Sequence, residues 1–303
     1  MSQTHNIRWL ISHEPVDLFL RTAEEFSRDI AKRTNGRINI EVYTLTDYAN
    51  KFKDGVKSDP MASLQNKEIE MTQVQMYKLG TYSTDFFALE MPFLFESHSH
   101  ATRVLEGDIG KSILASLKTT SPATGLAFTY SGGYRVIAAD KDIRTTEDLK
   151  GLEIATTTNP VEIATIESFG CKAVPVHTGD WTAETVAVRH NSQAVDTTLP
   201  RYKNEANVAV HKHVIDTKHS MFLTSIIIST DFWTSLSQED QEAIQASALH
   251  SSRLERQWSI DDADAISDNV EHQRELGITL NGFDLAEQAR LKEAVKPVYE
   301  QYS

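Results

Sequence analysis

The residues of this chain that could carry out chemistry do not form a catalytic or metal-binding set. His98 and His100, and likewise His211 and His213, have the spacing that would place two imidazoles on one face of a strand. No third ligand stands at metal spacing, so we interpret them as surface or capping histidines. Cys171 is the only cysteine, which excludes an internal disulfide and a cysteine-based metal cluster. We expect it to be a buried structural thiol, because unpaired cysteines are commonly buried.

The acidic pairs and the glycine-rich segment give no sign of an active site either. Glu24-Glu25, Glu239-Asp240 and Asp261-Asp262 fall on polar helix faces, where solvated charge is the ordinary interpretation. Ser131-Gly132-Gly133 has neither dinucleotide-binding nor P-loop spacing and predicts a turn between two strands. A G-x-S-x-G nucleophile elbow is absent from the sequence. The sequence therefore predicts a protein that is not an enzyme and that uses no metal or other cofactor.

Composition narrows the classes of partner. The 303 residues carry a net charge of −13, from 43 acidic and 30 basic residues. This balance argues against nucleic-acid binding, which normally needs a basic face, and it favours a monomer. No apolar stretch approaches the roughly 20 residues of a membrane-spanning helix. A strand is expected from Ile7 with no signal sequence before it, so we expect either a cytoplasmic protein or a mature chain whose signal has been removed.

The elements that would position a site alternate between short apolar strands and longer amphipathic helices, which indicates an α/β fold. Strands at 7–11 and 37–43 flank a helix at 17–34, which Asn35-Gly36 ends. Such a unit builds a parallel sheet through a right-handed crossover. A second series starts after Gly125. Its expected elements are strands at 125–130, 134–139, 151–156, 172–176 and 194–198, and helices at 160–169 and 181–189.

The C-terminal third returns to a strand at 223–229 and continues as a long helix. The capping box Ser237-Gln238-Glu239-Asp240 opens a helical stretch to Glu275 that contains no proline or glycine. About 38 residues at 1.5 Å each would reach about 57 Å, which exceeds one lobe, so we expect a bent helix that braces both lobes. The sequence thus predicts a hinged two-lobe α/β clamshell. Its expected parts are lobe I at 1–125, lobe II at 126–212, and a return strand and long helix at 213–303.

Several collinear segments resemble the periplasmic solute-binding subunit of tripartite ATP-independent periplasmic (TRAP) transporters. Ala88–Phe95 is similar to the family's acidic-Leu-Pro-Phe-Leu-Phe signature, and Thr146–Ile154 to its Pro-Glu-Asp-Leu-Lys-Gly-Leu-Lys-Ile segment. The resemblance covers nearly the whole chain. It implies a periplasmic binding protein-like fold, a periplasmic location, a small-molecule ligand, and the TRAP membrane subunits as partners. The further matching segments are Gly132–Arg135, Phe169–Cys171, Val174–Val176, Ala194–Thr198, Ile228-Ser229, Phe232-Trp233 and Leu236–Asp240.

The chain departs from the family pattern at the position that usually grips the ligand carboxylate. The family has an arginine after Gly-Leu-Lys-Ile, whereas Gly151–Ile154 is followed here by Ala155. The bidentate guanidinium fork that suits a carboxylate is therefore missing. The family's later acidic-Asn-Pro motif is replaced by Asp196-Thr197-Thr198, while Arg135 matches a second arginine of the family.

The missing arginine determines the expected ligand. An anion would be poorly compensated on burial, whereas aromatic faces and a carboxylate suit a small cation. We therefore favour a small amine or amino alcohol, with Asp196 backed by Glu14 as its carboxylate and with Trp181 and Tyr43 as walls. A neutral polyol and an organic acid held by Arg135 are the alternatives. The candidate ligand contacts are Trp9, Glu14, Tyr43, Gln75, Tyr77, Arg135, Ala155, Trp181, Asp196, Thr197, Thr198 and Phe222.

Two other classes of function were weighed against a binding protein. A hydrolase or transferase would need a nucleophile–base pair or a metal set, and the sequence shows neither. A purely structural partner protein would show no change with a ligand. A protein that closes on its solute about a hinge and delivers it to the membrane subunits accounts best for the sequence.

Overall fold

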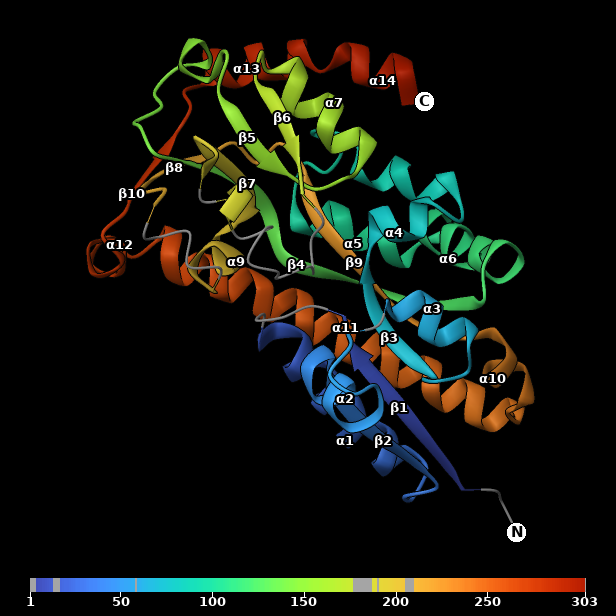
Figure 1. Ribbon diagram of the computed structural model, residues 1–303. Helices are drawn as coiled ribbons and strands as arrows, with labels where there is room; N and C mark the ends of the chain where they lie inside the picture. Colours follow the sequence, from blue (N-terminus) through green and yellow to red (C-terminus); the bar gives the residue numbers. More distant parts are fainter. Residues whose placement is uncertain are drawn as a thin grey trace. The chain divides into compact units, whose positions relative to one another are not determined.

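The computed structural model describes residues 4–12, 17–57, 59–176, 187–189, 191–204 and 210–302 (Figure 1). The chain divides into two compact units, each built from three stretches of sequence. The lobes expected at 1–125 and 126–212 stay a prediction. The first unit consists of Met1–Asp85, Ser99–Tyr130 and Leu223–Trp258, and the second of Phe86–His98, Ser131–Phe222 and Ser259–Ser303.

The sheet of the first unit has the strand order β2-β1-β3-β9. β1 (His5–Ile11) pairs in parallel with β2 (Ile38–Thr44) and β3 (Met71–Gln75), and β3 pairs antiparallel with β9 (Met221–Ser229). The crossover between β1 and β2 is α1 (Asp17–Arg33), an amphipathic helix as expected. Its buried face consists of Leu18, Phe19, Thr22, Ala23, Phe26 and Ile30.

Local sequence signals start the shorter helices of the first unit. The Thr44 hydroxyl accepts a hydrogen bond from the backbone N–H of Asp47 at 3.0 Å, which caps α2. Asp59 caps α3, and Pro60 occupies the first helical turn. Backbone N–H groups there have no acceptor within the helix, so the missing N–H of proline removes no hydrogen bond. The helices are α2 (Leu45–Phe52), α3 (Pro60–Gln65), α4 (Met76–Gly80), α5 (His98–Glu106), α6 (Asp108–Thr120), α10 (Thr230–Ser235) and the first two thirds of α11 (Gln238–Ser267). A 3₁₀ segment at Thr84–Glu90 begins in this unit, and its residues from Phe86 on belong to the second.

The strands of the second unit have the order β4-β7-β5-β6. β4 (Ala123–Ala139) pairs antiparallel with β7 (Ala194–Thr198). β5 (Glu153–Thr156) lies parallel to both β7 and β6 (Lys172–Pro175). Two further strands complete the unit: β8 (His213–Asp216) pairs antiparallel with β4 and parallel with β10 (Thr279–Gly282).

Helices of the second unit again begin where the sequence supplies caps. The Asn159 side chain accepts from the backbone N–H of Val161 at 2.9 Å and starts α7 (Pro160–Ser168). The Tyr302 hydroxyl donates to the Pro160 carbonyl at 3.2 Å, which ties the C-terminal helix to α7 (Figure 1). The other helices are α9 (Leu199–Asn204), α12 (Val270–Leu276), α13 (Leu285–Ala294) and α14 (Lys296–Tyr302), with a capped 3₁₀ turn at Thr146–Leu149.

The expected turn at Ser131-Gly132-Gly133 is wrong, because β4 continues through it from Ala123 to Ala139. Both glycines have positive φ angles, 93° and 81°, which residues with a side chain rarely adopt. A Cβ atom on Gly132 would also collide with the Thr198 hydroxyl. The glycines therefore allow close packing inside a continuous strand, where the sequence pattern alone indicates a turn.

The long C-terminal helix is present but ends earlier than expected. α11 stops at Ser267, and the Asn269 side chain accepts from the backbone N–H of His272 at 3.0 Å to start α12. Gly277, with a φ of 69°, then ends α12. The capping strength of Asn269 explains why the expected single helix to Glu275 is broken in two. The expected α/β fold with a long helix is confirmed, and no helix in the described part of the chain is long and apolar enough to cross a membrane.

Candidate ligand-binding site

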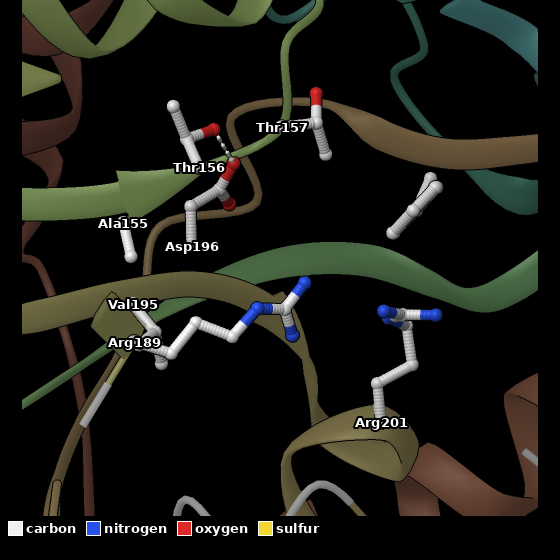
Figure 2. Close-up of a pocket in the computed structure, with 8 residues that line it drawn as sticks. Ala155, Thr156, Thr157, Arg189, Val195, Asp196 and Arg201 are labelled. Atoms are coloured by element: carbon white, nitrogen blue, oxygen red, sulfur yellow. Dashed lines mark hydrogen bonds between the residues drawn. The ribbon is translucent and has the colours of Figure 1, made fainter. Parts of the chain in front are cut away.

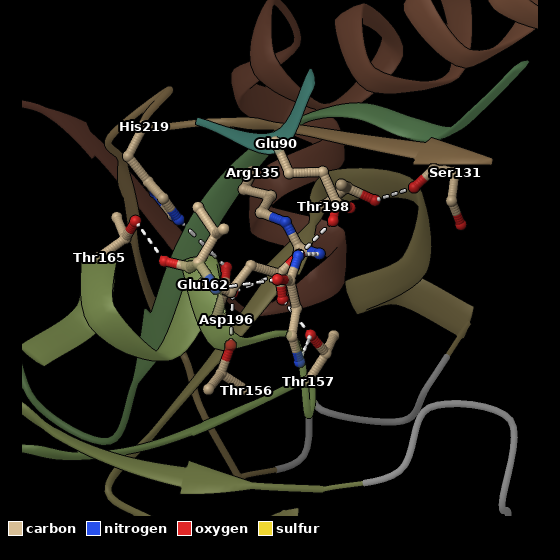
Figure 3. A network of polar contacts seen from close by, with 12 residues as sticks. Glu90, Ser131, Arg135, Thr156, Thr157, Glu162, Thr165, Asp196, Thr198 and His219 are labelled. Carbon is tan, nitrogen blue, oxygen red and sulfur yellow. Dashed lines mark hydrogen bonds and ion pairs between the residues drawn. The ribbon is translucent and has the colours of Figure 1, made fainter. Parts of the chain in front are cut away.

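The centre of the second unit holds a buried ion-pair network around Arg135 on β4 (Figure 3). The guanidinium group is completely buried, and its Nη1 donates to Asp196 Oδ2 at 3.0 Å. Its Nη2 donates to Glu162 on α7. The antiparallel register of β4 and β7 places Arg135 opposite Thr198, two residues from Asp196, so the sheet itself brings the pair together. Arg135 is therefore bound by the protein's own carboxylates.

Asp196 is compensated from three sides. In addition to Arg135, the Thr156 hydroxyl donates to its Oδ2 at 2.9 Å, and His219 Nε2 lies 3.5 Å from its Oδ1. Burial opposes ionisation of Asp196, but the attraction of Arg135 and the contact with His219 outweigh it, so the pKa of Asp196 lies below its usual range. This side chain is an ionised partner of Arg135 within the unit.

Two further acids complete the network and have the opposite pKa shift. Burial raises the pKa of Glu162, although Arg135 opposes this, and burial together with the charge of Glu162 raises the pKa of Glu90 well above its usual value. Thr157 donates to Glu162, and the Asn159 amide donates to Glu90. Glu90 belongs to the signature segment recognised in the sequence, so this segment supplies a carboxyl group to the network.

Replacing Glu90 by glutamine should stabilise the folded protein at neutral and alkaline pH. The folded state binds the Glu90 proton more tightly than the unfolded state, so stability falls as the pH rises from the unfolded pKa towards the raised folded pKa. Glutamine keeps an acceptor for Asn159 and cannot ionise. We expect a gain of about 1 kcal/mol at pH 8 that shrinks towards pH 4.5, measured by urea unfolding. The exposed control Glu96→Gln should show no such trend, and a loss of stability at pH 8 would contradict this prediction.

A small pocket lies beside this network, over the position where the family pattern has its arginine (Figure 2). Ala155 on β5 leaves space there, and Thr156 and Thr157 add hydroxyl groups. The enclosed volume is about 10 Å³, room for one water-sized group such as a carboxylate oxygen. The lining residues are Ala155, Thr156, Thr157, Arg189, Val195, Asp196, Arg201 and Phe222.

Two guanidinium groups, those of Arg189 and Arg201, point into this pocket (Figure 2). Arg201, at the start of α9, is 1% exposed, and its Nη1 donates to the Ser131 hydroxyl at 3.2 Å. The Phe222 ring has Arg201 Cζ at 4.7 Å from its centroid and Arg135 Cζ at 4.0 Å. Arg189 and Arg201 thus bring positively charged groups to a pocket wall on which Asp196 already pairs with Arg135.

Sequence reasoning brought together some of these residues and missed the two arginines. Ala155, Asp196 and Phe222 do meet at the pocket. Arg189 and Arg201 were not among the expected contacts, because nothing in their local pattern distinguishes them from surface arginines. The signal that was available is the position of Arg201, directly after the strand that carries Asp196 and in the helix turn that closes the pocket.

The other expected contacts of the second unit have separate environments. The Thr198 hydroxyl donates to the Ser131 carbonyl at 2.8 Å, inside the sheet. The Thr197 hydroxyl is buried and has no hydrogen-bond partner among the described residues. Trp181 lies outside the described residues. Cys171 is buried as expected; its Sγ donates to the Leu149 carbonyl at 3.2 Å, and burial raises its pKa to about 12.

In the first unit the expected contacts are mostly structural. Trp9 is completely buried and packs edge-to-face on Phe26, with ring centroids 5.1 Å apart. The Tyr43 hydroxyl donates to Glu41 at 2.5 Å and accepts from Lys51 Nζ at 2.8 Å.

Two more residues of the first unit lie around the end of β3, and one lies outside the described part. Gln75, the last residue of β3, is completely buried, and both polar atoms of its amide lack partners within the described chain. Tyr77, at the start of α4, is 7% exposed. Glu14 lies outside the described residues. A buried amide without partners is unusual and makes Gln75 the strongest contact candidate of this unit.

The described residues give no sign of a metal centre. They contain no group of three or more His, Cys, Asp or Glu side chains that could hold an ion. His98 and His100 lie in the first turn of α5 instead of on a strand. His211 is buried, and its Nε2 lies 2.8 Å from the Ser192 carbonyl oxygen. The pocket beside Ala155 is lined by arginines, hydroxyl groups, the Asp196 carboxylate, small apolar side chains and one aromatic ring.

The chain is similar to known solute-binding proteins over most of its length. The sequence model of the family described as bacterial extracellular solute-binding protein, family 7, matches residues 12–303. The 2,3-diketo-L-gulonate-binding periplasmic protein YiaO of Escherichia coli is 25% identical over 253 residues, which cover 82% of this chain and 73% of that protein. A solute-binding protein of Chromohalobacter salexigens is 20% identical over 285 residues, covering 93% of this chain and 80% of that protein.

Solved structures show the same fold. A TRAP periplasmic solute-binding protein from Xanthobacter autotrophicus, with bound β-D-galacturonate, is 25% identical with a TM-score of 0.83, covering 98% of this chain and 94% of that chain. A TRAP periplasmic solute-binding protein from Pseudomonas putida, with bound D-glucuronate, is 21% identical with a TM-score of 0.84, covering 98% of this chain and 92% of that chain.

Proposed function

The chain belongs to family 7 of the bacterial extracellular solute-binding proteins, the periplasmic binding proteins of TRAP transporters, and from this premise we propose that its ligand is a small organic acid. Proteins of this family bind and deliver solutes and are not enzymes. The observation that carries the proposal is the pair of guanidinium groups, Arg201 and Arg189, in the pocket beside Ala155. They supply positive charge from other elements where position 155 has none.

The comparisons favour an organic acid over the amine that Ala155 led us to expect. The solved relatives hold galacturonate and glucuronate, and a curated relative is a 2,3-diketo-L-gulonate-binding protein; all three ligands are sugar acids. A neutral polyol has the hydroxyl groups of these ligands but lacks the carboxylate. Sugar acids therefore form the class to test first.

The geometry supplies the physical reason against the amine. Asp196 was to be the carboxylate partner of the ammonium group, yet it already pairs with Arg135 at 3.0 Å and accepts from Thr156. An ammonium group in the pocket would instead face the guanidinium groups of Arg201 and Arg189 at short range. Like charges at a partly buried site repel strongly, since water screens them poorly. The amine interpretation therefore lacks support.

In our proposal one oxygen of the ligand carboxylate occupies the pocket and accepts hydrogen bonds from Arg201, with Arg189 and the Thr157 hydroxyl beside it. A guanidinium group is suited to this task because its donors form a fixed fork that matches a carboxylate. Phe222 holds the Arg201 group in place by stacking. Arg135 then acts as a positioning residue that fixes Asp196, whereas in the organic-acid alternative from the sequence it held the acid itself.

The hydroxyl groups of a sugar acid need polar partners as well. Thr197, in the same unit as the pocket, has a buried hydroxyl without a partner among the described residues, and it is a proposed contact for such a hydroxyl group. Delivery to the TRAP membrane subunits, closure about a hinge and action as a monomer in the periplasm complete the proposal. They rest on the family and on the sequence predictions above, and they stay predictions for this chain.

A thermal-shift screen tests the ligand class. We expect D-galacturonate or D-glucuronate to raise the melting temperature, because a ligand that binds only the folded state stabilises it by about 2.7 kcal/mol at a hundredfold excess over Kd. Ethanolamine and xylitol serve as the amine and polyol controls and should have no effect. The proposal would be wrong if an amine raised the melting temperature while a broad panel of sugar acids and other small organic acids did not.

A further inference from the structure

The first unit contains a second pocket, of about 400 Å³, far larger than the enclosed pocket beside Ala155. It lies between α5, α6, the first half of β4, and α11, and all of its lining residues belong to the first unit. Its wall is mostly apolar, from Leu105, Leu114, Leu126, Phe128 and Leu249. The volume falls in the range of pockets that hold whole small molecules.

The polar groups of the wall are already occupied, with the exception of two lysines. Arg256 donates to the Phe128 carbonyl at 2.8 Å and to Glu106, and Glu106 also pairs with Arg253 at 2.6 Å. The Gln245 amide donates to the Leu126 carbonyl at 2.8 Å. These groups therefore shape the wall and leave little capacity for a polar ligand.

Helix α6 contributes a face that combines apolar groups with positive charge. Leu114, Ala115 and Lys118 come three, four and seven residues after Lys111, which places all four on one side of the helix, along the pocket. Both lysines are exposed, and neither has an acidic partner within the described chain. A wall with three cations and a single carboxylate stands out in a protein of net charge −13.

We propose that this pocket binds an amphiphile with one negative head group and a single medium-length alkyl or similarly slender apolar body. The apolar body would displace water from the leucine-lined wall, which drives binding, and the head group would lie between the ammonium groups of Lys111 and Lys118. A neutral molecule would lose the head-group contacts, and a cation would be repelled. This second site is independent of the sugar-acid site of the other unit.

Isothermal titration calorimetry of the full chain with decanoate, below its self-association concentration, tests the proposal. We expect saturable binding of decanoate, weaker binding of decanol and no binding of decyltrimethylammonium. Ala115→Trp should fill the pocket and abolish the signal, whereas Ile109→Trp, at a position that is 61% exposed and outside the pocket, should retain it. Equal binding by the two tryptophan variants would overturn the proposal.

A charge variant tests the head-group contact without risk to the core. Lys111→Gln with Lys118→Gln should weaken decanoate binding roughly tenfold, since two exposed ion pairs with the head group are lost and exposed pairs are individually weak. The matched control Lys32→Gln with Lys212→Gln, and the sugar-acid-site variant Arg201→Gln, should leave it unchanged. A specific site for a free amphiphile would be ruled out if the control pair lost as much affinity for decanoate. It would also be ruled out if the protein bound phosphatidylglycerol vesicles and did not bind decanoate.

Discussion

Replacing Arg201 by glutamine is expected to lower the affinity for the sugar acid roughly 100-fold while the protein stays folded. Removal of one partner from a buried, hydrogen-bonded charge pair costs about 2–5 kcal/mol, and every 1.4 kcal/mol is a factor of ten. Arg201 is 1% exposed, so water cannot replace the lost donors. Calorimetry with D-galacturonate or D-glucuronate, whichever the parent binds more tightly, measures the effect.

Companion variants separate the role of Arg201 from a general loss of charge. Arg201→Lys keeps the charge but loses the planar fork, and should fall between the parent and Arg201→Gln. Arg189→Gln should have a smaller effect, because Arg189 is only half-buried. The exposed control Arg144→Gln, in the same unit, should bind as the parent does. If Arg201→Gln binds the acid as tightly as the parent, the carboxylate is held elsewhere.

Replacing Arg135 by methionine is expected to lower the free energy of unfolding of the ligand-free protein by about 3–5 kcal/mol. Asp196 and Glu162 would lose their common cation at sites where Asp196 has a fully buried side chain and Glu162 is 4% exposed. A buried carboxylate without a partner is far more costly than the same group in water. Urea unfolding with an unchanged slope gives the difference directly.

The pH dependence and a rescue variant identify the cause of that loss. Because Arg135 holds the pKa of Asp196 below its usual range, it contributes stability that is present above the unfolded pKa of about 4 and is lost at lower pH. The gap between parent and Arg135→Met should therefore narrow below about pH 4. Adding Asp196→Asn and Glu162→Gln should restore part of the stability at pH 7.

The control for the Arg135 variant is an exposed ion pair. Arg274 lies 3.0 Å from Glu271, with side chains that are 72% and 71% exposed, and Arg274→Met should cost less than about 1 kcal/mol. Should Arg135→Met cost no more than this control, the buried network would contribute little to stability, and Arg135 would instead be a candidate for direct contact with the ligand.

Much of the fold could be predicted from periodicity and capping residues. The helix expected at 17–34 is α1 (Asp17–Arg33), and the strand expected at 194–198 is β7 with the same bounds. These segments have one strongly apolar face and clear stops, so local sequence and tertiary packing agree. The continuous β4 and the break before Val270 were missed, because each depends on one contact or cap that periodicity does not reveal.

The ligand class was the part that the sequence could predict least. Ala155 brings no positive charge to the position where the family pattern has an arginine, but the amine inferred from this did not take account of Arg189 and Arg201, which line the same pocket from other elements. Asp196 looked available for an amine because its pairing with Arg135 depends on the register of β4 and β7. Charge balance in a site is a tertiary property, and one position of a motif does not determine it.

The buried thiol of Cys171 makes the protein convenient for single-molecule and fluorescence work. Alkylating reagents react with thiolates, and a thiol with a pKa of about 12 and little solvent contact yields almost none near pH 7. A cysteine introduced at an exposed position such as Ser112 would then be the reactive group in the native protein. A dye could be attached there without first removing the natural cysteine.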